Sequence, residues 1–163
     1  WFDKRWIYDE SLRTPLLARW PGVAKPGSES SAMVSNVDLA ETILDIAQAK
    51  IPADMQGHSL VPLLKNPLAN WRFTTLTTYA RGNHTLRSER YRYLRFEDGS
   101  EELYDHAEDP NEWTNLATRL KYAKLLKQFR KELPAKEAPY HPSVRSGAVN
   151  AWFEEHLRRH GVK

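Results

Sequence analysis

The chain has 163 residues, enough for one domain or a domain and a half. Its hydrophobic content of 40% and charged content of 28% are ordinary for a globular protein, and no apolar run approaches the ~18 residues that would cross a membrane. The net charge of +3 is too small to indicate nucleic-acid binding, and the absence of cysteine excludes disulfides, thiolate metal sites and a cysteine nucleophile within the chain.

The N-terminal segment, residues 1–13 (WFDKRWIYDESLR), crowds aromatic, basic and acidic residues ahead of a short apolar run. It shows no initiator methionine and no secretory or transit pattern, so we expect it to come from the interior of a longer protein. Residues 16–20, followed by Pro21 and Gly22, are predicted to form a strand buried inside a parallel sheet. The chain offers few parallel partners for this strand, and we therefore expect poor autonomous folding.

Two helical segments are predicted in the next part of the chain. Residues 22–35 are typical of a loop, and Ser35 with Asp38 has the spacing of a capping box that opens a helix ending near Gln48. The apolar face of this helix is predicted at Val37, Ala40, Ile43, Leu44 and Ala47. Residues 56–64 predict a turn followed by a short helical turn, with Ser59 as the N-cap and His58 in a capping or surface role.

From residue 74 onward the hydrophobic period changes to two, which favours strands. Four strands are predicted at residues 74–79, 84–88, 91–96 and 101–104, and Asp98-Gly99 is typical of a tight hairpin turn. A helix with an apolar stripe and a lysine-rich side is predicted from about residue 115 to residue 133. These segments predict a small antiparallel sheet packed by a helix. Residues 134–148 are typical of a loop, and residues 152–160 of one or two amphipathic turns.

Four motifs follow the N-terminal segment in a fixed order. They are residues 15–22 (PLLARWPG), residues 34–42 (VSNVDLAET), residues 56–64 (QGHSLVPLL), and residues 102–106 (ELYDH) with Asp109-Pro110 and Asn115-Leu116. Together they resemble the C-terminal portion of the type I sulfatases, within the alkaline-phosphatase-like superfamily, over roughly residues 1–133. The resemblance is strongest to iduronate-sulfatase-like members that act on sulfated sugars.

The resemblance implies an α/β fold in three parts. Residues 1–72 would end the large catalytic domain with its last core strand and helix. Residues 73–133 would form a C-terminal subdomain, a four-stranded antiparallel sheet packed by a helix. Residues 134–163 would be a C-terminal extension.

The resemblance also implies a role for Lys4. In sulfatases, a lysine four residues before a Tyr-acid pair and nine before an arginine contacts the sulfate group, and Lys4, Tyr8-Asp9 and Arg13 reproduce that spacing. A lysine ammonium there would stabilise the charge that develops on the ester during cleavage. We expect Lys4 to be the catalytic-site residue of this chain, and Arg13 to form a structural ion pair.

Other family features are absent from the sequence. It lacks the Cys-or-Ser-x-Pro-x-Arg signature, whose residue becomes the formylglycine nucleophile, and the paired aspartates that hold calcium. Its one Asp-His pair, Asp105-His106, matches the C-terminal motif and not the Asp-Asn or Asp-His pair with which the family holds calcium. The resemblance therefore implies that formylglycine and calcium belong to a missing N-terminal catalytic portion, and that this chain alone binds neither and is inactive. A periplasmic or secreted location would follow if the parent carries a signal peptide.

A further group of candidate residues comes from the glycine turn at residues 81–87 (RGNHTLR). It places Asn83, His84 and Arg87 at the start of a strand, where the resemblance implies that they could contact a sugar or its carboxylate. A hairpin with a surface histidine and a salt-bridged arginine is the alternative. His106 is predicted to belong to a turn. Because His141, His156 and His160 share no metal-ligand spacing, no metal site is predicted.

Three other functions remain open from the sequence. Residues 90–96 (RYRYLRF) interleave aromatic and basic residues as single-stranded nucleic-acid platforms do, but neither strand face is purely aromatic, and we expect no nucleic-acid partner. A phosphodiesterase or phosphonate hydrolase of the same superfamily would share much of this C-terminal half. A non-catalytic carbohydrate-binding module is the alternative from a different class. The expected partner in the sulfatase interpretation is a sulfated small molecule or glycan.

Overall fold

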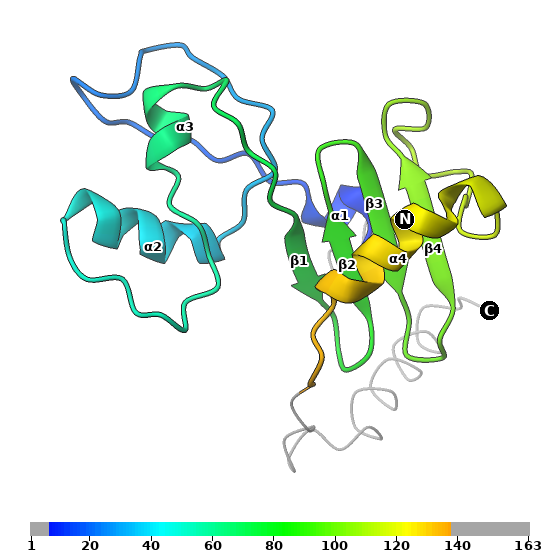
Figure 1. The fold of residues 1–163 in the computed structure, drawn as a ribbon. Coiled ribbons are helices and arrows are strands. Elements are labelled where there is room, and N and C mark those ends of the chain that lie inside the picture. Colours follow the sequence, from blue (N-terminus) through cyan, green and yellow to red (C-terminus); the bar gives the residue numbers. More distant parts are fainter. Residues whose placement is uncertain (1–6, 138–163) are drawn as a thin grey trace, which may run out of the picture. The chain divides into compact units, whose positions relative to one another are not determined.

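The computed structural model describes residues 7–137 (Figure 1). Its elements, in chain order, are α1 (Asp9–Leu12), α2 (Val37–Ile46), α3 (Val61–Lys65), β1 (Thr75–Thr78), β2 (His84–Arg87), β3 (Tyr91–Arg95), β4 (Glu101–Asp105), the 3₁₀ turn η1 (Leu120–Tyr122) and α4 (Ala123–Glu132). Within residues 7–137 no helix is both long and apolar enough to cross a membrane. Lys4 and the turns predicted at residues 152–160 lie outside the described residues.

The four predicted strands are confirmed as one antiparallel sheet with the order β1-β2-β3-β4. Consecutive strands pair as hairpins, with Thr78 opposite His84 and Arg95 opposite Glu101. The Asp98-Gly99 turn is also confirmed: Gly99 has a φ of 86°, and Asp98 Oδ1 accepts a hydrogen bond of 2.8 Å from the Ser100 amide. The alternating segments thus form an antiparallel meander, because the connection between each pair of consecutive strands is short.

One face of the sheet carries the larger hydrophobic core, and α4 lies across it (Figure 1). The buried residues of this core are Leu86, Tyr93, Leu103, Leu116, Leu126 and Phe129. The rings of Tyr93 and Phe129 stack with centroids 5.5 Å apart, which joins β3 to α4. This packing confirms the prediction of a sheet covered by a C-terminal helix.

The C-terminal helix begins later than the sequence predicts. Residues near Asn115 bond to β4 instead of starting a helix: the Leu116 amide donates to the Leu103 carbonyl at 2.8 Å, and Asn115 Oδ1 accepts from the Leu103 amide at 3.1 Å. Asn115 Oδ1 also accepts from the Ala117 amide at 2.9 Å, a local contact that competes with helical bonding. The regular helix therefore runs only from Ala123 to Glu132.

The side of the sheet packed by α4 carries an ionic contact that predicts sensitivity to acid. Arg130 donates to Glu101 at 2.7 and 2.5 Å and Tyr93 donates at 2.5 Å, and the Arg130 bonds, with a further contribution from Tyr93, lower the pKa of Glu101 to about 2 despite its partial burial. Because this pKa is lower in the folded state than the unfolded value of ~4.3, the contact stabilises the protein above pH ~4.5 and is lost as pH falls toward about 2. We expect the free energy of unfolding, measured by urea denaturation across this window, to depend less steeply on pH in Glu101→Gln.

The exposed Glu108 provides the control, since Glu108→Gln should keep the acid sensitivity of the unaltered protein. Identical pH slopes for Glu101→Gln and the unaltered protein would show that the Glu101 contact does not contribute.

The strand predicted at residues 16–20 is not formed. These residues have no regular secondary structure, and the side chain of Leu17 is 92% exposed. A strand of a parallel sheet needs neighbouring strands for its backbone hydrogen bonds, and all the strands of the described residues belong to the β1–β4 meander. The apolar run therefore forms no strand within the described residues.

The helix predicted after Ser35 is confirmed as α2, but its apolar side is not packed. Asp38 Oδ2 accepts a hydrogen bond of 2.7 Å from the Ser35 amide, which is the reciprocal half of the predicted capping box. The buried residues of α2 are Asp38, Glu41 and Thr42, while Val37 and Ile43 are 55% and 66% exposed. The predicted apolar face is thus open to solvent within the described residues.

Residues 57–60 dock on the polar side of α2. This close approach explains why the motif at residues 56–64 has a glycine at position 57. The His58 amide donates to Asp38 Oδ1 at 2.9 Å, and the Leu60 amide donates to Thr42 Oγ1 at 2.8 Å. A Cβ atom at Gly57 would lie 2.3 Å from the Val37 carbonyl oxygen, closer than any real contact. Only glycine therefore allows this backbone approach.

Candidate functional site

The face of the sheet opposite α4 receives the N-terminal segment of the described residues. Ile7 is 2% exposed and forms the second core cluster with Leu94 and Tyr104. These side chains belong to the same strand faces as Arg92 on β3 and Glu102 on β4, because strand residues two apart point the same way. The segment that follows Lys4 in sequence is therefore packed against a sheet face that carries charges.

At the centre of this face, Arg92 joins two carboxylates from distant parts of the chain. Its NH2 group donates to Asp9 Oδ1 at 2.5 Å, and its Nε forms an ion pair with Glu112 Oε1 without hydrogen-bond geometry. The side chains of Arg92 and Glu112 are 2% and 3% exposed. Charges this deeply buried stay ionised only when they are paired, so the three residues depend on one another.

His106 and Arg87 extend this ionic cluster, defined here as Asp9, Arg87, Arg92, His106 and Glu112. His106 Nε2 lies 2.7 Å from Glu112 Oε1, and the Arg87 NH2 group lies 3.0 Å from His106 Nδ1. Since a guanidinium can only donate, Nδ1 accepts this bond and the ring carries its proton on Nε2, which donates to Glu112. The predicted turn at His106 is present, and its ring has the additional task of linking Arg87 to Glu112.

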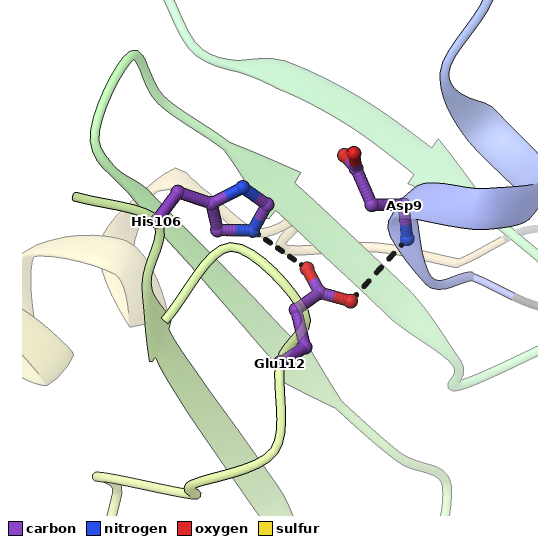
Figure 2. A group of neighbouring side chains, drawn as sticks. All are labelled: Asp9, His106 and Glu112. Carbon is purple, nitrogen blue, oxygen red and sulfur yellow. Dashed lines mark hydrogen bonds and ion pairs between the residues drawn. The ribbon is translucent and has the colours of Figure 1, made fainter. Parts of the chain in front are cut away.

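Glu112 has an unusual backbone that its side-chain contacts hold in place. Its φ of 57° lies in the left-handed region, where residues other than glycine are uncommon. Figure 2 shows its carboxylate between the His106 ring and the backbone of Asp9, whose amide donates to Glu112 Oε2 at 3.3 Å. The carboxylate thus contacts three separate elements, and these contacts compensate for the backbone conformation.

Arg87 is the least satisfied member of the ionic cluster. It donates to the backbone carbonyls of Ser88 and Glu89, but its buried Nε has no hydrogen-bond partner, and the Asp9 carboxylate lies 3.9 Å away. Burial, and next the like charge of Arg92, lower the pKa of the Arg87 guanidinium. Arg87 is therefore a desolvated cation whose main hydrogen-bond acceptors are the backbone carbonyls directly after β2.

The same cluster contains the group of residues that could hold a metal ion. Ligand atoms of Asp9, His106 and Glu112 lie within 4.8 Å of one another (Figure 2). However, Arg92 already contacts both carboxylates, and Arg87 occupies the free nitrogen of His106. A cation at this position would have to displace a guanidinium, so the arrangement fits an ionic network better than a calcium or zinc centre.

A second contact beside the ionic cluster also joins the N-terminal segment to the sheet. The hydroxyls of Tyr8 and Tyr104 both donate to Glu102 Oε2, at 2.9 and 2.8 Å. Burial, and next the neighbouring Glu102 carboxylate, raise the pKa of both tyrosine hydroxyls. Both hydroxyls therefore remain proton donors to Glu102.

The structure separates the three residues predicted to bind substrate. His84 and Arg87 are three residues apart on β2 and so point to opposite faces of the sheet; His84 is 5% exposed, and its Nδ1 lies 2.8 Å from Thr78 Oγ1. Asn83 Oδ1 accepts from the Glu97 amide at 3.3 Å. Only Arg87 belongs to the ionic cluster, and the role of all three in binding substrate stays a prediction.

Sequence reasoning missed Asp9, Arg92 and Glu112 as members of one site. A partial signal was available for Arg92, which shares one strand face with the apolar Leu94 and Phe96; a charge beside apolar residues on a strand face can indicate a buried ion pair. Nothing comparable indicates its partners, because Asp9 and Glu112 lie in a helical turn and a loop far away in sequence.

Comparisons with known proteins agree with this architecture. Residues 1–138 match the family described as N-sulphoglucosamine sulphohydrolase, C-terminal. The chain is 35% identical to an N-acetylglucosamine-6-O-sulfatase of Bacteroides thetaiotaomicron, over 86% of the chain and 27% of that protein. It is also 34% identical to arylsulfatase K of Canis lupus familiaris, over 72% of the chain and 25% of that protein.

A solved structure extends the likeness to three dimensions. A protein in complex with its substrate D-glucosamine-2-N,6-O-disulfate matches with a TM-score of 0.72 and 36% identity, over 82% of this chain and 30% of that one. The chain thus spans about a quarter to a third of the length of these relatives. From the family match and these identities, the chain belongs to the sulfatase family and corresponds to its C-terminal part.

Proposed function

We propose that this chain acts as the C-terminal part of a sulfatase that hydrolyses sulfate esters on a sulfated amino sugar. The observation that carries the proposal is the 35% identity to an N-acetylglucosamine-6-O-sulfatase over 86% of the chain. The structural likeness to a protein solved with a disulfated glucosamine supports the same substrate class. The chain's own contribution would be Lys4, on the segment that precedes the anchored residues Ile7, Tyr8 and Asp9.

Lys4 would act on charge. As a sulfate ester breaks, negative charge grows on the departing oxygen, and an ammonium group aimed at it lowers the barrier because the attraction is stronger in the transition state than in the substrate. Lys4 would thus contact the sulfate and stabilise the leaving oxygen. Arg87, Asn83 and His84 remain proposed sugar contacts, with Arg87 the best placed because it shares the sheet face on which Tyr8 and Asp9 are anchored.

The residues described here do not fit a calcium site. Among residues 7–137 the one group of potential ligands is Asp9, His106 and Glu112, and guanidinium groups already occupy their ligand atoms. The sequence also lacks a cysteine or the signature from which a formylglycine would form. We therefore propose that nucleophile and metal ligands come from a portion of a longer protein that this chain does not contain.

Sulfate release tests the proposal directly. The longer protein should release inorganic sulfate from glucosamine 6-sulfate, measured by ion chromatography, whereas residues 1–163 alone should release none because the chain lacks a nucleophile. Glucosamine 6-phosphate serves as the matched control substrate. Release of phosphate but not of sulfate would replace this proposal with phosphate-ester chemistry, and binding of the sulfated sugar without any turnover would favour a carbohydrate-binding module.

A further inference from the structure

The positive charge of this chain is concentrated on α4 and the turn before it. Residues 119–131 hold six lysine and arginine side chains and no acidic one. The whole chain has a net charge of +3, so the residues outside this segment are together net negative, at −3. The excess of basic side chains is therefore local, and it belongs to one helix and its N-terminal turn.

Four lysines of this segment form one exposed surface, named here the basic face: Lys121, Lys124, Lys127 and Lys131. The three that belong to α4 are spaced three and four residues apart and so share one side of the helix. Leu126 and Phe129 lie on the other side, where α4 packs on the sheet (Figure 1). The basic face thus points away from the core.

No carboxylate neutralises the basic face within residues 7–137, where none of its four lysines forms an ion pair. Arg130 differs from them, since it pairs with Glu101. Glu132, the one acidic residue of α4, accepts a hydrogen bond of 2.8 Å from Thr74 Oγ1. Residues 138–163 have four basic and two acidic side chains, so their sequence offers no excess of negative charge either.

The stability of the helix does not account for these lysines. Lys124 lies in the first turn of α4, where the helix dipole favours acidic side chains and where α4 has none. Like charges three or four residues apart repel one another, as Lys127 does with Lys124 and with Lys131. A helix face that merely contacts water would be more stable with charges of both signs. The uniform sign therefore points to an anionic partner.

The spacing of the lysines fits an extended polyanion. Residues 124–131 span about 10 Å along the helix axis, at about 1.5 Å per residue. A single sulfate group cannot contact all three lysines of this stretch, whereas a chain with repeated sulfate groups can. Lysine ammonium groups are flexible, strongly hydrated point charges, unlike the planar guanidinium that fixes one geometry. Such a surface attracts an anionic chain without requiring one position of it.

We propose that the basic face binds a sulfated polysaccharide chain and holds it near the enzyme while individual sulfate esters are hydrolysed. The choice of a sulfated polysaccharide over other polyanions rests on the proposed function, in which the substrate is a sulfated amino sugar. The basic face is separate from the ionic cluster, because α4 covers the opposite face of the sheet. Binding there raises the effective concentration of the polymer without taking part in the chemistry.

Heparin, a polysaccharide with sulfated glucosamine units, is the probe for a binding test on residues 1–163. The triple variant Lys124→Gln/Lys127→Gln/Lys131→Gln should bind fluorescently labelled heparin about tenfold more weakly, because each exposed ion pair contributes about twofold to fivefold to affinity. Its affinity should also depend less steeply on salt concentration, since fewer counterions are released on binding. Fluorescence anisotropy over a series of salt concentrations measures both effects.

The matched control removes three exposed lysines elsewhere, in Lys25→Gln/Lys50→Gln/Lys65→Gln. This variant has the same net charge as the α4 triple variant, and its affinity for heparin should stay within about twofold of that of the unaltered protein. Equal losses of affinity in the two triple variants would show that heparin responds to net charge alone. That result would overturn the basic face as a binding site.

Thermal unfolding separates binding from folding. Because the three lysines repel one another, the α4 triple variant should unfold at the same temperature as the unaltered protein or at a higher one. Glutamine has nearly the same helix propensity as lysine, so the substitutions themselves do not disfavour α4. A clear drop in the unfolding temperature would assign the lysines to the stability of the helix and contradict the proposal.

Two further probes test the chemical class of the partner. Desulfated heparin keeps the sugar chain and should bind at least about tenfold more weakly than heparin, because the sulfate charges are gone. Single-stranded DNA of equal length should also bind more weakly at the same salt concentration, because lysines alone offer no ring on which bases stack. DNA binding as tight as that of heparin, and lost in the α4 triple variant, would replace the polysaccharide with a nucleic acid.

Kinetics of the longer protein distinguish this proposal from the proposed function. The α4 triple variant should raise KM for heparin and leave both kcat and KM for glucosamine 6-sulfate unchanged, because the basic face takes no part in the chemistry. An unchanged KM for heparin would overturn the role of the basic face. A lack of sulfate release from either substrate would instead contradict the proposed function, and the binding test with heparin would still decide whether the basic face is a site.

Discussion

Replacing Lys4 with alanine is expected to lower kcat for a sulfated amino sugar by about 10²–10³-fold, the usual effect of removing one donor that stabilises developing charge. The positive charge of Lys4 would stabilise the negative charge on the departing oxygen. The contacts that anchor Ile7, Tyr8 and Asp9 on the sheet are made by other side chains. Folding should therefore be nearly unchanged. Steady-state kinetics of the longer protein, together with its thermal unfolding temperature, measure both expectations.

Lys25 is the matched control for this substitution. It is exposed in the loop at residues 22–35, and Lys25→Ala should leave both kinetics and stability unchanged. Unaltered kinetics in Lys4→Ala would remove the catalytic assignment. A large loss of thermal stability would instead mean that Lys4 belongs to the packing of the N-terminal segment.

Arg92→Met is expected to lower the free energy of unfolding by about 3–5 kcal/mol, which is the usual cost of removing one partner from a buried ion pair. The reason is that Asp9 and Glu112 would lose their shared cation, and Glu112 is 3% exposed and cannot turn to water. Methionine fills a similar volume, so the loss reports the charge rather than a cavity. Urea denaturation monitored by circular dichroism gives the difference.

Arg130→Met is the control, because Arg130 also pairs with a glutamate but is 46% exposed; its loss should be at most about 1 kcal/mol. Adding Glu112→Met to Arg92→Met should restore part of the stability, since it removes an unpaired buried charge. The double variant also provides folded protein if Arg92→Met does not fold. Equal losses for Arg92→Met and Arg130→Met, or no recovery in the double variant, would contradict a buried ionic network.

The sheet could be predicted from local pattern because each of its strands alternates in sequence and each turn has its own chemistry. The residues Asp98 and Gly99 specify a tight turn whatever surrounds them, and Gly99 does adopt the positive φ that such a turn requires. The family was also accessible from the order of short motifs, which the comparisons confirm. These features depend on residues near one another in the chain.

The predictions that depended on packing partners from other parts of the fold were less successful. The run at residues 16–20 is apolar enough for a buried strand, yet it forms none, because strand formation requires partners that the described residues do not supply. The apolar side of α2 is likewise exposed at Val37 and Ile43. Periodicity indicates which side of an element is apolar, but it does not supply the surface that covers that side.

By itself the sequence determined the antiparallel sheet, the membership in the sulfatase family and the choice of Lys4 as the residue to test. Only the tertiary structure decided that Asp9 and Glu112 meet at Arg92, and that Arg87 joins them while His84 faces the other way. The physical reason is that a buried charge is stable only beside the partners that neutralise it, and those partners can lie anywhere in the sequence. Asp9 and Arg92 are 83 residues apart in sequence, and folding alone brings them within hydrogen-bonding distance.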